Sequence, residues 1–278
     1  MPFQPSGWRH FPILGITVLL RRYQIESVSP LNLMEENANI IEAFTELAPR
    51  YEQVVDSELN RIWGWSYNSF VNLLIAATSI QPQDIILDIA TGTGVIPSRL
   101  EKAGHPRQQI HGLDITISML RHARRRLADQ DGQANHNLAC ASALDMPYAN
   151  SAFSQVLCGL ATHHKDVNQL VGETNRVLRN GGRLTIADVG GSKILKNPVV
   201  KFLVRVVAFC YFLLHENKTR AWAESDAVSN VLSKDDWSVL LWEYGFRNIA
   251  IQELKTRYFW VPAPLLIKAE KMGDGLHD

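Results

Sequence analysis

The stretch Ile85-Ile86-Leu87-Asp88-Ile89-Ala90-Thr91-Gly92-Thr93-Gly94 decides the fold of this chain. Residues 85–89 are typical of a buried parallel strand that carries one acid, and the glycines then predict a sharp turn into a helix beginning near Val95. Glycine lets a backbone come close to a ligand, and the first turn of a helix offers free N–H groups. The pattern therefore predicts a nucleotide-type site beside the turn. The alternative is an ordinary strand, turn and helix with no ligand.

The residues around the turn restrict the class of ligand. A dinucleotide site needs Gly-x-Gly-x-x-Gly, and the third glycine would fall at Pro97. A P-loop is excluded because no Gly-Lys-Ser/Thr follows. The carboxylate of Asp88 repels a pyrophosphate but suits a cation or a ribose hydroxyl. We therefore expect S-adenosylmethionine, which is cationic and carries no phosphate, and not NAD. A larger side chain at Gly94 is expected to block this cofactor sterically.

A second acid ends a second short strand, at residues 109–114. Asp114 lies 20 residues after Gly94, where a carboxylate can accept hydrogen bonds from the 2′ and 3′ hydroxyls of a ribose. The alternative is that Asp114, or Thr116, is only the N-cap of the next helix. That helix is indicated by apolar residues at helical spacing, namely Ile117, Leu120, Ala123 and Leu127.

With these residues in place, the chain resembles the class I S-adenosylmethionine-dependent methyltransferases, and among them most of all the ubiquinone/menaquinone-biosynthesis C-methyltransferase group. The resemblance covers about residues 40 to 270, and its motifs stand in the family's order. The motifs are FTELAPRY at 44–51, LDIATGTG at 87–94, GLDI at 112–115 with Met119-Leu120, ALDMPY at 143–148, residues 153–157, and RVLRNGGRL at 176–184.

The resemblance also implies which residues hold the cofactor. One position departs from the family's pattern, because Ala141-Ser142 stands where relatives often carry Gly-Asp, whose carboxylate bonds the adenine amino group. A serine can still bond the base, although less strongly than a carboxylate. The implied cofactor residues are Asp88, Ala90, Thr91, Gly92, Gly94, Asp114, Ile115, Met119, Ser142, Ala143, Leu144 and Gly159.

Strands and helices continue to alternate after the second acid, which predicts an α/β fold. We expect strands at residues 135–141, 153–160, 183–189, 246–254 and 265–270, with helices at 166–178 and 234–244. The resemblance implies a Rossmann-like, doubly wound, seven-stranded and mostly parallel sheet with helices on both faces. It also implies that the last strand runs antiparallel beside the fifth, and that one helical lid is inserted after the fifth strand.

Two segments lie outside this core. We expect the methyltransferase domain at residues 36–272, a helical insertion or lid at 196–230, an N-terminal extension at 1–35 and a tail at 273–278. The extension has a short apolar run at 11–20 and no signal-peptide pattern, so we expect a disordered or surface-attached segment. Residues 198–214 are apolar apart from Lys201 and Arg205. We expect a buried helix over the substrate cavity; contact with a membrane surface comes second and a stable membrane span third.

The composition of the chain restricts which partners, metal sites and cellular compartments are expected. A chain of 278 residues with 46% apolar residues can bury one sizeable core. Its formal net charge is zero, which gives no electrostatic case for a nucleic-acid partner. The three cysteines lie far apart, and His163 and His164 are adjacent in sequence, so their side chains are expected to diverge. We therefore expect no metal site and a cytoplasmic enzyme with reduced thiols, while the oligomeric state stays open.

The methyl group of S-adenosylmethionine is already electrophilic, so the protein has mainly to align a small, apolar or aromatic acceptor for C- or O-methylation. Candidates for a general base are His163, His164, Asp188 and Tyr51, and at most one of the two histidines is expected to act. The alternatives are an enzyme of this fold that performs other chemistry, such as a cyclisation in natural-product biosynthesis, and a binding protein with a vestigial site. Aromatic residues that suit a ring-shaped acceptor are Tyr51, Trp63, Trp65, Tyr67, Trp222 and Tyr258.

Overall fold

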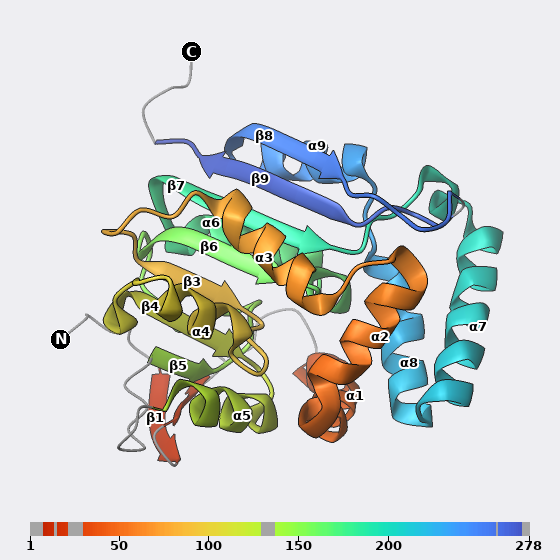
Figure 1. Ribbon diagram of the computed structural model, residues 1–278, viewed down its shortest axis with the longest axis horizontal. Coiled ribbons are helices and arrows are strands. Elements are labelled where there is room, and N and C mark those ends of the chain that lie inside the picture. The colour runs from red at the N-terminus through yellow and green to blue at the C-terminus, as the bar shows by residue number, and fades with distance from the viewer. Residues whose placement is uncertain (1–7, 14–15, 22–29, 129–136, 260, 274–278) are drawn as a thin grey trace.

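The computed structural model describes residues 8–13, 16–21, 30–128, 137–259 and 261–273. It has an α/β architecture, with one sheet between two layers of helices (Figure 1). The strands are β1 (Trp8–Ile13), β2 (Ile16–Arg21), β3 (Ile86–Ile89), β4 (Ile110–Asp114), β5 (Asn137–Cys140), β6 (Phe153–Gly159), β7 (Leu178–Asp188), β8 (Phe246–Glu253) and β9 (Leu265–Lys271). The α-helices are α1 (Pro30–Leu47), α2 (Tyr51–Trp63), α3 (Tyr67–Thr78), α4 (Val95–Lys102), α5 (Ile117–Leu127), α6 (Val167–Val177), α7 (Pro198–His215), α8 (Lys218–Ala227) and α9 (Lys234–Glu243).

The predicted doubly wound sheet is confirmed. Strands β3 to β9 follow the spatial order β5-β4-β3-β6-β7-β9-β8, and the first five of these are parallel. β9 runs antiparallel between β7 and β8, as the family resemblance implied. The chain order reverses on either side of β3, and this is the topological switch point where ligands bind in open α/β sheets.

The N-terminal extension differs from the prediction. Of the two expectations, a disordered or a surface-attached segment, the described residues contradict the first, because β1 and β2 form an antiparallel pair and β2 pairs in parallel with β5. The described residues therefore form a nine-stranded sheet. Apolar and β-branched residues in this run favour a strand, and the edge of β5 offers unpaired backbone groups that a further strand satisfies. The exact domain boundaries at residues 35 and 272 stay a prediction.

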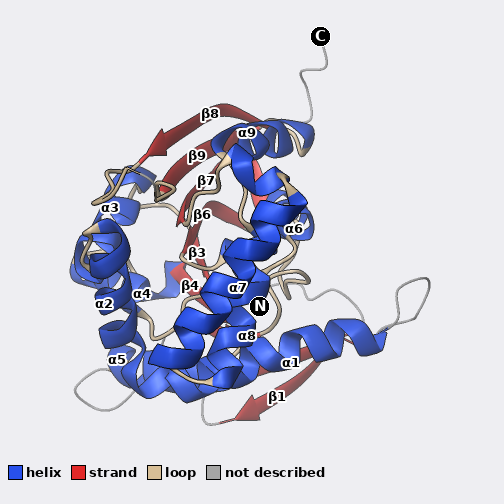
Figure 2. Ribbon diagram, turned by 90° about the vertical axis from the view of Figure 1, so that its right-hand side faces the viewer, coloured by secondary structure: helices blue, strands red, loops and turns tan. Residues whose placement is uncertain are grey.

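Burial on both faces explains the apolar run in β3. Leu87 and Ile89 pack in one core with residues of α6 and α9, among them Leu170 and Trp237. Ile86 points to the opposite face and packs with residues of α3 and α4, such as Leu74 and Leu100. Figure 2 shows the sheet between these two helical layers. The one polar residue of the strand, Asp88, is thereby held in place beside the turn.

The carboxyl ends of the parallel strands face a third group of helices, formed by α1, α2 and α8 (Figure 1). The helix α7 lies outside α8 at the surface (Figures 1 and 2). The expectation of a buried helix over the substrate cavity is wrong, because none of the described residues of α7 is buried. Its neighbour α8 takes the buried place, with Arg220, Ala221 and Ala223 in the interior.

Candidate functional site

The turn after β3 leaves open space at one glycine. Ala90 and Gly92 both have a φ of +54°, so the backbone bends back sharply over the end of the strand. Apart from the two residues next to Gly92 in sequence, the nearest described atom to a Cβ added there would be the Ala90 carbonyl oxygen, 3.9 Å away. Gly92 is therefore the point where a ligand can approach the backbone.

Gly94 has a different role. It precedes α4 with a φ of +76°, and a Cβ there would lie 2.9 Å from the Cβ of Ala123 and 3.1 Å from its Cα. The expected clash of a larger side chain with the cofactor stays a prediction, and the structure adds a clash within the protein. The clash is with α5, so Gly94 allows two helices to pack closely.

Asp88 lies beneath the turn with only 1% of its surface exposed. One carboxylate oxygen accepts a hydrogen bond from the Thr91 hydroxyl at 2.6 Å, and the other has no partner among the described residues. Burial raises the pKa of Asp88 to about 7, against the opposing hydrogen bond from Thr91, with a further increase from Asp114. An orphaned buried carboxylate oxygen is costly in isolation, and a cationic ligand nearby would stabilise it.

Asp114 ends β4 beside the same turn. Its Oδ2 accepts from the Gly92 N–H at 2.9 Å, and its Oδ1 accepts from the Thr116 N–H at 2.8 Å. Thr116 is the N-cap residue of α5, without a side-chain cap hydrogen bond. Asp114 thus braces both the glycine turn and the start of α5. Because a carboxylate has about four acceptor positions, it keeps capacity for hydroxyl donors.

A row of cavities follows the carboxyl edge of the sheet. The central cavity is lined by Ala90, Gly92, Asp114, Ile115, Met119 and Gly159, six of the predicted cofactor residues. Thr91 lines a neighbouring cavity that shares Tyr51 and Gly92 with the central one. A larger cavity of about 570 Å³ shares Ile115 and His164 with it. The shared lining residues show that these cavities adjoin one another.

Two further predicted residues line the larger cavity. Ser142 accepts from the Leu144 N–H at 3.1 Å, and the Leu144 carbonyl accepts from Gln169 at 2.9 Å. These bonds fix the loop after β5. Ala143 is instead a member of the hydrophobic core and faces inward.

His163 and Asp188 form a buried polar pair next to His164, which lines two of the cavities. The Nδ1 atom of His163 lies 2.7 Å from Oδ1 of Asp188. Asp188 also accepts from the backbone N–H groups of Ala161, Thr162 and Val189. Burial raises the pKa of Asp188, but these donors and His163 outweigh it and lower the pKa. Asp188 is therefore a weak proton acceptor whose oxygens are occupied by these donors and by His163, so its geometry suits orienting His163 better than acting as the base.

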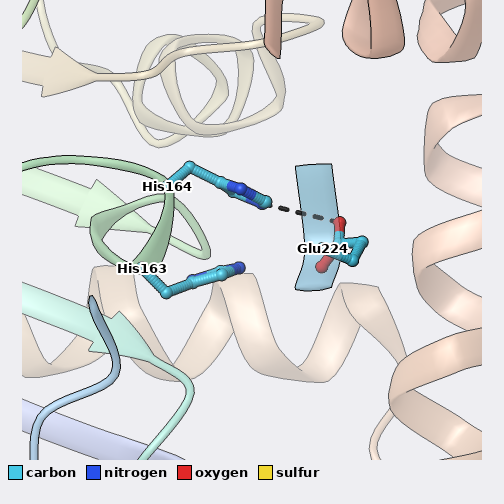
Figure 3. Close-up of side chains that lie close together, drawn as sticks. All are labelled: His163, His164 and Glu224. Carbon is cyan, nitrogen blue, oxygen red and sulfur yellow. Dashed lines mark ion pairs between the residues drawn. The ribbon is translucent and has the colours of Figure 1, made fainter. Parts of the chain in front are cut away.

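The two histidines do not diverge as predicted. They lie on a 3₁₀ helix, η3 (Thr162–His164), and their ring centroids are 4.2 Å apart. Both rings point toward Glu224 of α8 (Figure 3), and Nε2 of His164 lies 3.5 Å from Oε1 of that residue. Burial lowers the pKa of both histidines, but Asp188 reverses this for His163, whose pKa is raised, while that of His164 falls well below its ordinary value. His163 is therefore the stronger proton acceptor.

Arg220 was missed by the sequence reasoning. It is 5% exposed, pairs with Glu224 at 2.8 Å and Glu58 at 3.3 Å, and lies over the rings of Phe44 and Phe212. Burial raises the pKa of Glu58 to about 7, although Arg220 opposes this. The sequence does contain Arg220 and Glu224 one helical turn apart, but such spacing is more typical of a solvated ion pair.

The grouping of His163, His164 and Glu224 brings three potential ligand atoms within 4.8 Å of one another. A metal ion there would meet the Arg220 guanidinium, which already binds the Glu224 carboxylate at 2.8 Å. The charge repulsion disfavours a cation at this position. The four side chains form a largely buried polar cluster beside the cavities, of which His164 lines two.

The structure divides the predicted aromatic set. Tyr51 and Tyr67 line a cavity next to the glycine turn. Trp63 and Trp65 donate their indole N–H groups to the carbonyls of Pro262 and Lys255 and so tie α2 to the loop before β9. Trp222 and Tyr258 are 46% and 38% exposed. Phe44 of α1, which was not in the predicted aromatic set, packs edge-on against His164.

Comparison with known proteins agrees with this geometry. A family described as a methyltransferase domain matches residues 86–182. Demethylmenaquinone methyltransferase of Lactobacillus johnsonii is 26% identical over 78% of this chain and 88% of its own length. A ubiquinone/menaquinone biosynthesis C-methyltransferase of Geotalea daltonii is 24% identical over 80% of this chain and 94% of its own. Geranyl diphosphate C-methyltransferase of Streptomyces coelicolor, solved with S-adenosyl-L-homocysteine, shares the fold with a TM-score of 0.59, at 15% identity over 80% of this chain and 84% of that one.

Proposed function

Because the chain belongs to the class I S-adenosylmethionine-dependent methyltransferases, we propose that it methylates a small, apolar, quinone-like ring. S-Adenosylmethionine is its cofactor, and when bound it supplies a sulfonium-activated methyl group. The relatives named for menaquinone and ubiquinone synthesis support a ring acceptor of this class. The observation that carries the proposal is the Asp188–His163 pair, which stands beside cavities lined by Phe44 and Tyr51.

The residues present fit the cofactor. The unpaired oxygen of Asp88 suits its ammonium group, Asp114 suits the ribose hydroxyls, and Ser142 suits the base. Gly92 leaves the room for close approach. The assignment of these residues to individual groups of the cofactor is part of the proposal.

We assign the general base to His163. Asp188 holds Nδ1, which fixes the tautomer and leaves Nε2 to accept a proton from a ring hydroxyl or an acidic ring carbon. His164, whose pKa is depressed by burial, stays neutral and shapes the cavity wall with Phe44. The buried Arg220 provides positive charge near the acceptor end, where an acceptor anion would form.

The direct test is a transfer assay. The purified chain is incubated with methyl-labelled S-adenosylmethionine and three acceptors: a demethylated naphthoquinol with a short prenyl tail, a simple phenol, and a primary amine. We expect labelled product from the naphthoquinol, with the methyl on ring carbon or oxygen as located by mass spectrometry. Label only in the amine would overturn the acceptor class. Conversion of an acceptor without gain of label would favour the cyclisation-type alternative.

We also propose that the enzyme works in the cytoplasm. In the described part of the chain Cys140, Cys158 and Cys210 are all free, which suits a reducing compartment. Fractionation of cells that make the native chain tests this, and recovery from an oxidising compartment would contradict it.

A further inference from the structure

The helix α7 carries its apolar residues on the side that faces solvent. The exposed ones recur every three or four residues, so they form a single stripe along the helix. At the most exposed positions, Val207 and Leu214, 69% and 82% of the residue surface is open. This apolar stripe consists of Val199, Phe202, Leu203, Val206, Val207, Leu213 and Leu214.

The opposite side of α7 holds the helix to the protein. Arg205 forms an ion pair with Asp226 of α8, and the Tyr211 hydroxyl accepts from Arg61 at 2.7 Å. Phe209 packs against Trp222 with ring centroids 4.7 Å apart. A surface helix normally has the reverse arrangement, with apolar residues inward and charges outward. These contacts of Arg205, Tyr211 and Phe209 set the orientation of α7, and the described residues leave its apolar stripe uncovered.

The chain segment that contains the stripe is basic. Residues 190–215 contain Lys193, Lys196, Lys201 and Arg205 and no Asp or Glu. Acids of other elements lie nearby, because Lys193, Lys196 and Arg205 pair with Asp235, Asp236 and Asp226. These pairs are solvent-exposed and weak, so anionic headgroups can compete for the cations. An apolar helix face on a basic segment is complementary to a lipid surface with anionic headgroups.

Size argues against a second copy of the chain as the occupant. A helix of 18 residues is about 27 Å long, and one face about 10 Å wide covers about 270 Å². A stable dimer buries about 800 Å² on each partner. Two copies would also bring their cations together. By length and composition α7 could cross a membrane, but its ion pair and ring contacts with α8 hold it against the enzyme.

We propose that the apolar stripe of α7 docks the enzyme on the surface of an anionic membrane. The helix lies in the plane of the lipid headgroups with the stripe inward, and the side that carries Arg205 stays toward α8. α8, which is next to α7, carries Arg220 and Glu224 into the acceptor end of the site. If the proposed function holds, a lipid-dissolved acceptor therefore has a short route from the bilayer to the site.

Vesicle sedimentation tests the docking without turnover, so its outcome is separate from that of the methyl-transfer assay. The full chain is mixed with vesicles of phosphatidylcholine and phosphatidylglycerol, or of phosphatidylcholine alone. We expect binding to the mixed vesicles that weakens with added salt. Val207→Asn with Leu214→Asn should lower the partition coefficient about tenfold or more, since two apolar side chains lose their burial in lipid. Both positions are exposed, so the fold should persist.

Trp242→Ser is the matched control. Trp242 is 59% exposed on α9, away from α7, and its loss should leave vesicle binding unchanged. Equal binding by the wild type and the Val207→Asn, Leu214→Asn variant would overturn the proposal. So would a wild-type dimer in sedimentation equilibrium that the same double variant converts to a monomer, with no vesicle binding by either. Resistance of the bound wild type to extraction by alkaline carbonate would show a spanning helix and would also overturn surface docking.

Discussion

The two ends of the site are built in different ways. At the proposed cofactor end, Asp88, Gly92 and Asp114 come from two adjacent strands and the turn after the first of them, and the Asp114 carboxylate accepts from the backbone N–H groups of Gly92 and Thr116. At the acceptor end, His163 and Glu224 come from η3 and α8, and the bonds between residues are mostly between side chains. A cofactor site fixed by backbone geometry can stay constant while side chains at the other end change the acceptor.

The largest effect that separates the two ends is expected at His163. The substitution His163→Ala should lower turnover about 10²–10⁴-fold, the usual contribution of a positioned base. Cofactor affinity, measured by calorimetry, should stay near the wild-type value because His163 does not line the cavity that contains Gly92 and Asp114. His164→Ala is the paired variant and should keep more of the activity. Loss of cofactor binding in His163→Ala would show that the ends are not independent.

The pH profile sharpens the same assignment. The base must be neutral, so kcat/KM should rise with pH through the pKa of His163, which Asp188 raises above its ordinary value despite the opposing effect of burial. Asp188→Asn removes the charge that favours the imidazolium, so the rising limb should move to lower pH while the maximum rate falls. An unchanged limb in Asp188→Asn would assign the limb to another group.

The second-largest effect distinguishes two glycines of one turn. Gly94→Val should destabilise the fold by about 2–5 kcal/mol, from the left-handed backbone and the clash with Ala123. Gly92→Val shares the positive φ but meets open space in the protein, so it should lose less stability and more cofactor affinity. Thermal unfolding measures the stability of both variants, and calorimetric titration measures their cofactor affinity. Equal unfolding temperatures would contradict the packing role of Gly94.

A smaller effect is expected at Asp114. Asp114→Ala removes acceptors for the ribose and also releases the Gly92 and Thr116 N–H groups, so cofactor affinity should fall by about 1.5–3 kcal/mol. Asp114→Asn keeps one oxygen and should lose less. The fold should survive both substitutions. Wild-type affinity in a folded Asp114→Ala protein would reduce Asp114 to a brace for the turn and α5.

The smallest effect concerns stability against pH, and here the two ends should behave alike. Asp88 and Glu58 each have a pKa raised to about 7, mainly by burial. A raised carboxyl pKa stabilises the fold at low pH, and this contribution is lost as pH rises from the unfolded value toward 7. Asp88→Asn and Glu58→Gln should therefore gain stability relative to wild type between pH 5 and pH 8. Unfolding temperatures that keep a constant gap to the wild type at every pH would reject this.

The difference between the two ends of the site explains which features could be predicted from the sequence. The α/β class, the seven core strands and the glycine turn follow from short-range patterns in which each residue's role depends on its neighbours. Ala90, Gly92 and Asp114 were predicted because each directly follows or ends a short apolar strand, and these residues do come together around one cavity. Gly94 was placed correctly in the turn, but its close neighbour, Ala123, is 29 residues further along the chain.

The acceptor end could not be predicted in the same way. Arg220 and Glu224 enter the site because α8 folds over the carboxyl edge of the sheet, and no local pattern encodes that placement. The histidines were expected to diverge, as neighbours on a strand do, but a 3₁₀ helix brings their rings together. The apolar segment of α7 was expected to be buried because apolar residues usually are, yet its polar contacts face the protein.

The order of the last two strands has a consequence for synthesis of the chain. β8 is made before β9, but its hydrogen-bond partner in the sheet is β9, which separates it from β7. On the ribosome β8 must therefore wait, and the edge of β7 stays open until residues 265–271 have left the exit tunnel. Nascent chains arrested before Leu265 should be protease-sensitive from β8 onward, while the half of the sheet around β3 is already closed. This edge of the sheet therefore forms only after β9 has been synthesised.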